Sequence, residues 1–318
     1  MQRIGFVVFE GFQSMSFAAL SVFEYANTIA GKPLYEMHFI SEKGGLVRSS
    51  TGMAVDSKRF GEAAYDTVIV GGGTSILQNA PAALLDFIRK AAKSSRRVAS
   101  ICTGAFILAE AGILDDKRVT THWWHARELQ ARYPKIKMEE DRIFIIDGNV
   151  WTSAGMTAGI DLALALVEKD LGADLTHSIA QKLVIYHRRA GGQSQHSALL
   201  ELAPKSDRIQ NALVYAKKNL HTPLSVEQLA EAAHLSPRQF SRAFRAETGQ
   251  SPAKAVENLR LEVARTMMEQ TRHSLDEVAQ EAGFGDRRRL REAFLRAYGQ
   301  PPQAIRRNAR TETSLQTN

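Results

Sequence analysis

One stretch of this sequence occurs twice within residues 225–302, and the repeat limits what the C-terminal part of the chain can fold into. Ser225 in the first copy aligns with Ser274 in the second at an offset of 49 residues, whereas Phe244 aligns with Phe294 at an offset of 50. Two copies are too few for a solenoid, which needs about three repeats to bury a continuous core. The repeat therefore predicts two similar helix-turn-helix motifs, with one more residue in the turn of the second.

Each copy has the residue pattern of a helix, a short turn and a second helix. The first helix is expected to begin at a serine cap, Ser225 or Ser274, with a weaker capping box at Ser274. Apolar residues then recur at the i, i+3, i+7 spacing of one helical face: Val226, Leu229 and Ala233 in the first copy, and Leu275, Val278 and Ala282 in the second. Ser236 and Pro237 predict the start of the next helix, because proline lacks an N–H and suits the first helical position.

The second helix of each copy is predicted to be apolar inside and basic outside. Its inward residues are expected to be Phe240 and Phe244 in the first copy, and Leu290 and Phe294 in the second. The outward residues are Arg238, Gln239, Arg242 and Arg245 in the first copy, and Arg287, Arg288, Arg289 and Arg291 in the second. One basic helix face is often only a solvated surface. Two equivalent faces, each on the second helix of a tight pair, favour binding to the major groove of double-stranded DNA.

Residues 207–307 resemble the DNA-binding domain of the AraC/XylS transcription regulators. The resemblance rests on the segments Arg260–Arg265, Val278–Phe284 and Tyr298–Pro302, with Ile305 and Arg306. It implies that the two second helices enter successive major-groove segments about 34 Å apart, one helical turn of DNA.

The resemblance also indicates which side chains touch bases: Arg238 and Arg242 from the first copy, and Arg287 and Arg288 from the second. Glu292 departs from many relatives, which have a basic or polar residue late in the second helix. A carboxylate there can accept a hydrogen bond from a cytosine amino group but repels phosphate, so Glu292 either specifies sequence or faces away from DNA.

Charge is distributed as this interpretation requires. Residues 201–318 contain 19 Lys and Arg against 14 Asp and Glu, whereas residues 1–200 contain 22 against 20. One cysteine excludes a disulfide scaffold and a multi-cysteine zinc site, and neither a metal nor a cofactor is expected. The chain shows no leader pattern and no apolar run near the length of a membrane span, so a cytoplasmic, nucleoid-associated location is expected.

Residues 1–186 alternate between short apolar strands and helices. Strands are expected at 4–9, 35–40, 67–70 and 98–101, helices at 15–29, 81–93, 104–111 and 157–171, and a hairpin at 143–153 with its turn at 147–149. This order predicts a flavodoxin-like α/β fold, a mostly parallel sheet sandwiched by helices, followed by the all-α part with two helix-turn-helix motifs. Ligands of such a sheet bind beyond the carboxyl ends of its strands.

The sole cysteine, Cys102, lies where a buried strand meets a helix. At such an elbow the helix dipole is expected to lower the thiol pKa. The segment 71–73, Gly-Gly-Gly, follows another strand and is either a tight turn or a loop whose N–H groups bind a carboxylate. A lone cysteine is often a small core residue, and His122 could merely cap or pack against the following helix.

Residues 3–185 resemble the PfpI-like branch of the class I glutamine amidotransferase-like superfamily, on the motif around Cys102 and the stretch 112–123. In enzymes of that branch the cysteine is the nucleophile, and an acidic residue from the first strand–helix loop lies beside it. Ser16 takes that place here, and a hydroxyl is no proton acceptor near neutral pH. No catalytic residue is therefore expected. The expected ligand-binding residues are Cys102, His122, Ser16, Gly72, Gly73 and Thr103.

The whole chain resembles GlxA-type regulators. The expected organisation is a sensor domain (1–186), a linker (187–206), a DNA-binding domain (207–307) and a flexible tail (308–318). The expected partners are DNA, a small-molecule effector, a second copy bound through the N-terminal domain, and RNA polymerase. The effector class that the resemblance suggests is an amino acid or a quaternary amine, the latter held by cation–π contact with Trp123, Trp124 or Trp151. Two alternatives are a cysteine-dependent hydrolase or hydratase fused to a DNA-binding domain, and a ligand-free architectural DNA binder.

Overall fold

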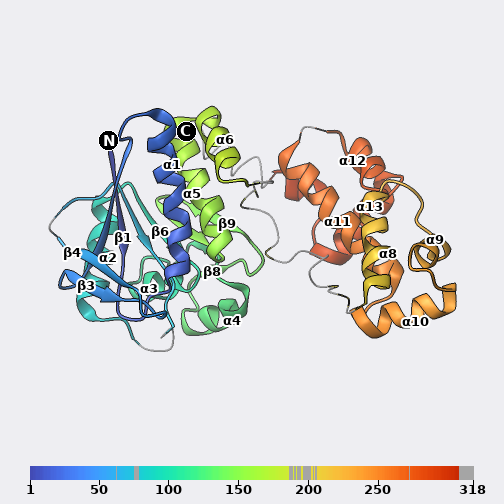
Figure 1. Cartoon of the computed structure of the whole chain (residues 1–318), viewed down its shortest axis with the longest axis horizontal. Helices are drawn as coiled ribbons and strands as arrows, with labels where there is room; N and C mark the ends of the chain where they lie inside the picture. The colour runs from blue at the N-terminus through green and yellow to red at the C-terminus, as the bar shows by residue number, and fades with distance from the viewer. Residues whose placement is uncertain are drawn as a thin grey trace. The chain divides into compact units, whose positions relative to one another are not determined.

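The computed structural model describes residues 1–61, 63–74, 79–185, 189, 191, 195, 202, 204, 206–271 and 273–307. The chain divides into two compact units, Met1–Gln195 and His196–Asn318 (Figure 1). Most of the expected linker and all of the expected tail fall outside the described residues. Within the described part of the chain, no helix is long and apolar enough to cross a membrane.

The first unit is built on an eight-stranded sheet with the order β3-β4-β2-β1-β5-β6-β10-β9. Its central strands run parallel: β1 (Gln2–Val7), β2 (Tyr35–Ser41), β5 (Thr67–Val70), β6 (Arg97–Ile101) and β10 (Val150–Ser153). At one edge β9 (Phe144–Asp147) pairs antiparallel with β10, which confirms the predicted hairpin. At the other edge β3 (Gly45–Arg48) pairs antiparallel with β4 (Ala54–Arg59). Two short strands, β7 (Arg118–Val119) and β8 (Lys137–Met138), form a second, small sheet.

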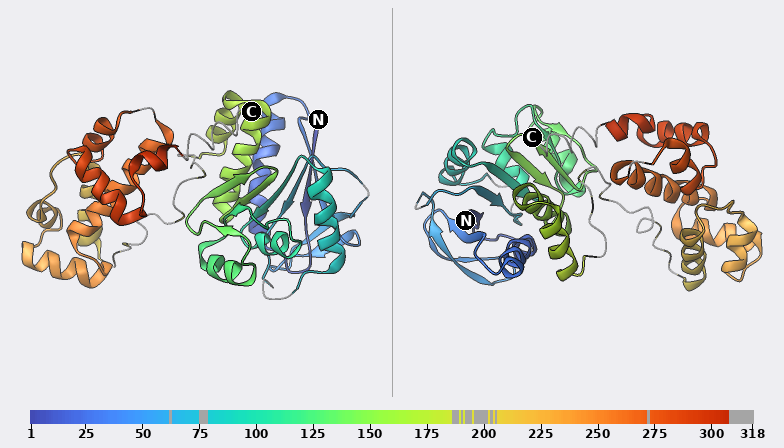
Figure 2. Two further views of the ribbon diagram at one scale, coloured as in Figure 1. Left: turned by 180° about the vertical axis from the view of Figure 1, so that it is seen from behind. Right: turned by 90° about the horizontal axis from the view of Figure 1, so that it is seen from above.

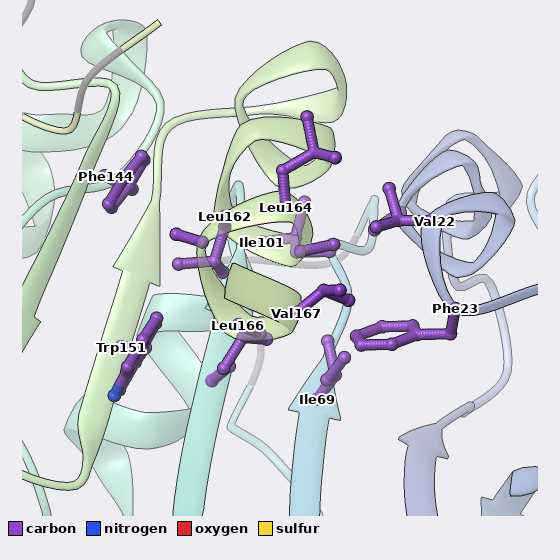
Figure 3. Packing of buried hydrophobic residues seen from close by; sticks show 14 of the residues in the cluster. Val22, Phe23, Ile69, Ile101, Phe144, Trp151, Leu162, Leu164, Leu166 and Val167 are labelled. Carbon is purple, nitrogen blue, oxygen red and sulfur yellow. The ribbon is translucent and has the colours of Figure 1, made fainter. Parts of the chain in front are cut away.

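Helices cover both faces of the large sheet, as the predicted α/β fold requires (Figures 1 and 2). One face is covered by α1 (Leu20–Ala30), α5 (Met156–Leu171) and α6 (Ala173–Lys182). The other is covered by α2 (Ala82–Ser94), α3 (Gly104–Glu110) and α4 (Trp123–Arg132). Figure 3 shows the first of these cores, where Ile69 and Ile101 of the sheet lie beneath side chains of α5, with Phe23 of α1 beside them.

The first unit differs from the predictions at two places described here, the start of its first helix and the β3–β4 hairpin. The segment expected as one helix over residues 15–29 begins with a 3-10 helix, η1 (Ser14–Ala19), and becomes α-helical only at Leu20. The β3–β4 hairpin has no counterpart among the expected strands. Most of its side chains are exposed, so its sequence lacks the apolar signal that identified the buried strands.

A buried ion-pair cluster lies where β2 and β6 begin and α5 ends. The guanidinium of Arg97 donates to both carboxylate oxygens of Asp170, Arg96 donates to the same carboxylate at 3.0 Å, and the Tyr35 hydroxyl donates at 3.1 Å. Burial alone would raise the pKa of Asp170, but the hydrogen bonds and charge of Arg97 outweigh burial and lower it. Burial, followed by the Asp170 charge, raises the pKa of Tyr35 far above its usual value. The cluster therefore keeps one carboxylate ionised inside the unit.

We expect Asp170→Ala to destabilise the first unit by about 3–5 kcal/mol, because it leaves the buried Arg97 guanidinium without its carboxylate. Urea unfolding of the two proteins at pH 7 measures the difference. Asp86→Ala, which removes a solvent-exposed partner of Arg89, is the control and should cost less than about 1 kcal/mol. Because the pKa of Asp170 is lowered in the folded state, its contribution is present above the unfolded pKa and is lost as the pH falls through the folded one. A difference that does not shrink in acid would contradict this assignment.

The second unit contains the two predicted helix pairs. The first pair is α9 (Val226–Ala232) and α10 (Pro237–Thr248), and the second is α12 (Leu275–Glu281) and α13 (Arg287–Tyr298). The helix α8 (Asp207–Lys218) precedes them, and α11 (Pro252–Gln270) connects them. Phe240, Phe244, Leu290 and Phe294 are buried as predicted. The capping box at Ser274 and Glu277 is complete, so the expectation that it is weaker than the first was wrong.

Candidate functional site

Cys102 is located at the sharp turn between β6 and α3. Its φ of 57° lies in the left-handed region, which costs a non-glycine residue on the order of 1–3 kcal/mol. The main chain on both sides is tied down, since the Cys102 N–H donates to the Ser153 carbonyl at 3.0 Å and the Cys102 carbonyl accepts from the Thr121 hydroxyl at 2.8 Å. Backbone strain held in place by surrounding bonds is a mark of functional sites in proteins.

The turn at Cys102 is brought against the glycine loop by a close main-chain contact at Gly104. A Cβ atom on Gly104 would lie 2.2 Å from the Val70 carbonyl oxygen and 2.9 Å from that of Gly71. Only glycine therefore allows α3 to begin directly against the end of β5. The contact places Cys102 and Thr103 beside the loop formed by Gly72 and Gly73.

Four of the predicted site residues are joined by hydrogen bonds across this contact. The Ser16 hydroxyl accepts from the Gly72 N–H at 3.3 Å, and the Thr103 hydroxyl accepts from the Gly73 N–H at 3.1 Å. A Cβ atom on Gly72 would lie 3.4 Å from Cβ of Cys102, so the cysteine belongs to the same group. The structure thus brings together Ser16, Gly72, Gly73, Cys102 and Thr103. Both loop N–H groups already donate to side-chain hydroxyls. This favours a tight turn stabilised by hydrogen bonds over a preformed binding site for a carboxylate.

The thiol of Cys102 is buried, and burial decides its acidity. Desolvation raises the pKa of Cys102 above its usual value, and hydrogen bonds from Thr103 oppose the rise without cancelling it. The expectation that the helix dipole would lower this pKa was therefore wrong. Ser16, also buried, supplies a hydroxyl where the related enzymes have an acid. A raised thiol pKa lowers the thiolate fraction near neutral pH, and a serine hydroxyl is a weaker proton acceptor than a carboxylate.

His122 lies next to Thr121, whose hydroxyl binds the Cys102 carbonyl. Its Nδ1 accepts from the Trp124 N–H at 3.3 Å, so the imidazole caps the N-terminus of α4. The ring also stacks on Trp123, with 5.7 Å between the centroids. The helix-capping role foreseen as the alternative for His122 is therefore present, and its role toward a ligand stays a prediction.

The three tryptophans differ in exposure. Trp151 is only 1% exposed and lies under the Arg97 guanidinium, 5.3 Å from ring centroid to Cζ, so it is a core residue. Trp123 and Trp124 are 44% and 69% exposed, and their rings meet edge-on at 5.3 Å. An accessible aromatic surface therefore lies at the start of α4, next to His122.

Two residues near the end of the first unit, which the sequence analysis did not single out, form hydrogen bonds with its core helices and loops. The Gln195 side chain accepts from the Trp123 N–H at 2.9 Å and donates to the Thr121 carbonyl at 2.9 Å. Arg189 donates through its backbone N–H and its Nε to the buried carboxylate of Asp161, at 3.0 and 2.8 Å. These contacts are long-range and polar, and no periodic pattern in the sequence announces them. They tie the chain that leads toward the second unit to α5 and to the start of α4.

Histidine, cysteine, aspartate and glutamate side chains do not gather in groups of three or more in the described part of the chain, so no metal site is assigned there.

The second unit presents the predicted basic residues of α10 to solvent. Arg238, Arg242 and Arg245 are exposed and belong to no ion pair among the described residues. Gln239 is exposed too, but its Oε1 accepts from the Ser236 N–H at 3.2 Å and from the Ser236 hydroxyl at 2.8 Å in the capping box. The arginines are therefore available for DNA, while part of the Gln239 amide serves the helix start.

The basic residues of α13 are exposed as well, but most are paired with acids. Arg287 lies 3.6 Å from Asp276, Arg288 lies 3.5 Å from Glu292, and Arg289 lies 3.5 Å from Asp286. Such exposed pairs contribute roughly 0–1 kcal/mol and can be exchanged for phosphate or base contacts. Glu292 is itself exposed, so it does not face the protein interior. Arg291, the fourth arginine predicted to face outward on this helix, is exposed too.

Comparisons with known proteins agree with both parts of the structure. Residues 2–169 match the DJ-1/PfpI family, and residues 229–308 match a helix-turn-helix domain. The transcriptional regulator GbdR of Pseudomonas aeruginosa is 32% identical over 95% of this chain and 83% of its own length. The transcriptional regulator GlxA of Rhizobium meliloti is 30% identical over 97% of both chains. An isonitrile hydratase of Pseudomonas putida is 33% identical over 57% of this chain and 77% of its own.

A solved structure supports the fold of the first unit. The crystal structure of an AraC family transcriptional regulator from Pseudomonas putida aligns with a TM-score of 0.51 at 24% identity, over 57% of this chain and all of the other. The fold, the basic helix pairs and these relatives define a DNA-binding transcription regulator with two domains. The chain belongs to the GlxA-type regulators, which join a DJ-1/PfpI domain to an AraC-type helix-turn-helix domain.

Thiol alkylation tests the buried state of Cys102. Because burial raises the pKa of Cys102, the rate of reaction with iodoacetamide should reach half its maximum at a pH above ~8.5, the pKa of an ordinary cysteine. The only cysteine in the chain is the one measured, and the urea-unfolded chain is the control. If the folded protein reaches its half-maximal rate at a pH well below that of the unfolded chain, the thiolate is activated and the assignment is contradicted.

Replacing Arg238 or Arg242 with Ala should cost about 1–3 kcal/mol on the preferred DNA sequence and relax preference at one or two base pairs. Lys218→Ala removes the same charge from the exposed surface of α8 and is the control. Binding isotherms on the preferred duplex and on single-base variants give both quantities. Equal weakening on every sequence would mean that the two arginines contact phosphate only.

Proposed function

We propose that this regulator reads DNA with α10 and α13 and that a small molecule bound beside Cys102 changes this reading. The observation that carries the proposal is the pair of bonds from Gln195 to Thr121 and Trp123. Thr121 holds the Cys102 carbonyl, and Gln195 is the last residue of the first unit, where the chain leads on to the second. A ligand that prefers one arrangement of this region thereby biases the segment between the units.

The proposed effector is an amino acid or a quaternary amine. The exposed rings of Trp123 and Trp124 offer a cation–π surface for the ammonium group. The hydroxyls of Ser16 and Thr103 hold the glycine loop nearby, and a carboxylate that replaced them would gain the loop N–H groups. Ligand-binding roles for Cys102 and His122 belong to the same proposal.

A second candidate is a cysteine-dependent hydratase or hydrolase, which the similarity to the isonitrile hydratase favours. The raised pKa of the Cys102 thiol and the hydroxyl at position 16 both argue against it. We therefore propose a sensor without catalytic activity.

We further propose that the protein dimerises through the first unit. The basic excess of the second unit is modest, so binding of two linked copies is needed to raise the affinity for DNA. We also propose that the regulator contacts RNA polymerase in the cytoplasm.

A thermal-shift screen with amino acids and betaines tests the sensor role. A ligand that binds only the folded protein stabilises it by about 2.7 kcal/mol at 100 times its Kd, so the melting temperature must rise. DNA binding measured with and without the hit should then differ. Cys102→Ser should shift the ligand concentration that gives half of this change. Unchanged potency would assign Cys102 to the core, and conversion of the hit by the wild-type protein would support the enzyme instead.

A further inference from the structure

The helix α11 belongs to two hydrophobic cores at once. Its first half contributes Leu259 to the core of α8, α9 and α10, and its second half contributes Leu261 to the core of α12 and α13. Arg260 lies between these two leucines, at the point where the helix passes from one core to the other. Contacts made by α11 at this point therefore join the two hydrophobic cores.

Arg260 contacts the turn before the first helix pair through two main-chain oxygens. Its Nε donates to the Leu220 carbonyl at 3.0 Å, and one terminal nitrogen donates to the Thr222 carbonyl at 2.7 Å. Both carbonyls belong to the turn between α8 and α9. The planar guanidinium presents its donors to both carbonyls in a fixed fork, whereas lysine has three rotatable donors on one nitrogen and does not reproduce that geometry.

The second helix pair meets the same turn through Gly283. A Cβ atom on Gly283 would lie 1.8 Å from the Leu220 carbonyl oxygen and 2.7 Å from Nε of Arg260. The equivalent residue of the first copy is His234, which has a positive φ of 54° although it is not glycine. The turn itself therefore accepts a side chain. Glycine is required in the second copy because the turn between α8 and α9 packs directly against it.

An ion pair between α13 and α11 supports this arrangement. Arg296 of α13 donates to Glu257 of α11 at 2.8 Å, and Glu257 lies in the half of α11 that packs with the first pair. The contact at Gly283 and this ion pair thus fix the second helix pair at two points, one on the turn between α8 and α9 and one on α11.

We propose that Arg260, the Leu220 carbonyl and Gly283 form a junction that sets the spacing of the two DNA segments this protein reads. The inference rests on the proposed role of α10 and α13 as reading helices. Two binding elements held rigidly at the correct separation bind together far more tightly than either alone, and they reject targets with another separation. A junction that no longer holds the two helix pairs rigidly lowers the joint affinity and also lets the protein bind targets with another separation.

The test uses the full chain and duplexes of two kinds. The first duplex is selected from a random pool by the wild-type protein, and the second carries one extra base pair between the two contacted segments. One base pair displaces the segments by about 3.4 Å and rotates them by roughly 35°. The spacing ratio is the Kd for the second duplex divided by the Kd for the first, and for the wild type it should be roughly tenfold or more.

Arg260→Lys and Gly283→Ala are the test variants, and Gly285→Ala is the control. Gly285 has a φ of 79°, close to the 80° of Gly283, but no atom lies within 4 Å of its Cβ position. The control therefore adds backbone strain without touching the junction. We expect both test variants to bind the selected duplex roughly tenfold more weakly and to bring the spacing ratio close to one, while Gly285→Ala keeps the wild-type ratio.

A wild-type spacing ratio in Arg260→Lys would overturn the proposal, even if its affinity falls. Arg260→Lys also decides the matter if thermal unfolding shows that Gly283→Ala does not fold. If the wild type itself binds both duplexes equally, the two helices do not read DNA jointly. The inference then fails together with the proposed reading function, and Arg238→Ala on each duplex shows whether the first helix still reads.

Discussion

The first unit depends on one contact between main chains, at the start of α3. Because a Cβ on Gly104 would come within 2.2 Å of the Val70 carbonyl, the helix begins in direct contact with the neighbouring strand. The residue two before it, Cys102, must then adopt a left-handed conformation to turn the chain from β6 into α3. The positions of Thr103 and of the glycine loop follow from that turn. The geometry of the proposed ligand site is thus a consequence of how tightly two strands and a helix are packed.

The two ends of the sheet differ in the kind of polar groups that they hold. At one end Arg97, Asp170 and Tyr35 form a buried, charged cluster whose loss would leave an uncompensated charge, so this end is fixed. At the other end the groups are neutral hydroxyls and main-chain N–H groups, together with a strained cysteine. Neutral hydrogen bonds contribute on the order of 1 kcal/mol each and can be exchanged for those of a ligand. A stable end and an exchangeable end in one sheet suit the proposed sensor role.

Sequence reasoning succeeded where the signal was local. The repeated caps and apolar spacing located α9, α10, α12 and α13, and the buried apolar runs located the central strands. It failed where the outcome depends on three-dimensional surroundings. The exposed β3–β4 hairpin has no apolar pattern, and the acidity of Cys102 is set by burial and not by the helix after it. The bonds of Gln195 and Arg189 join residues far apart in sequence, so no window of residues could reveal them.

The two proposed reading helices differ in charge, and the proposed junction at Arg260 gives a reason for that difference. Arginines of α10 have no acidic partners among the described residues, so α10 can supply most of the electrostatic attraction to phosphate. On α13 each of three arginines faces a carboxylate, and Glu292 repels phosphate unless DNA offers a donor such as a cytosine amino group. Alone, α13 would bind weakly. When α10 is bound, α13 can contact only the adjacent DNA segment. Its preference for particular bases there lets the protein distinguish one operator from another.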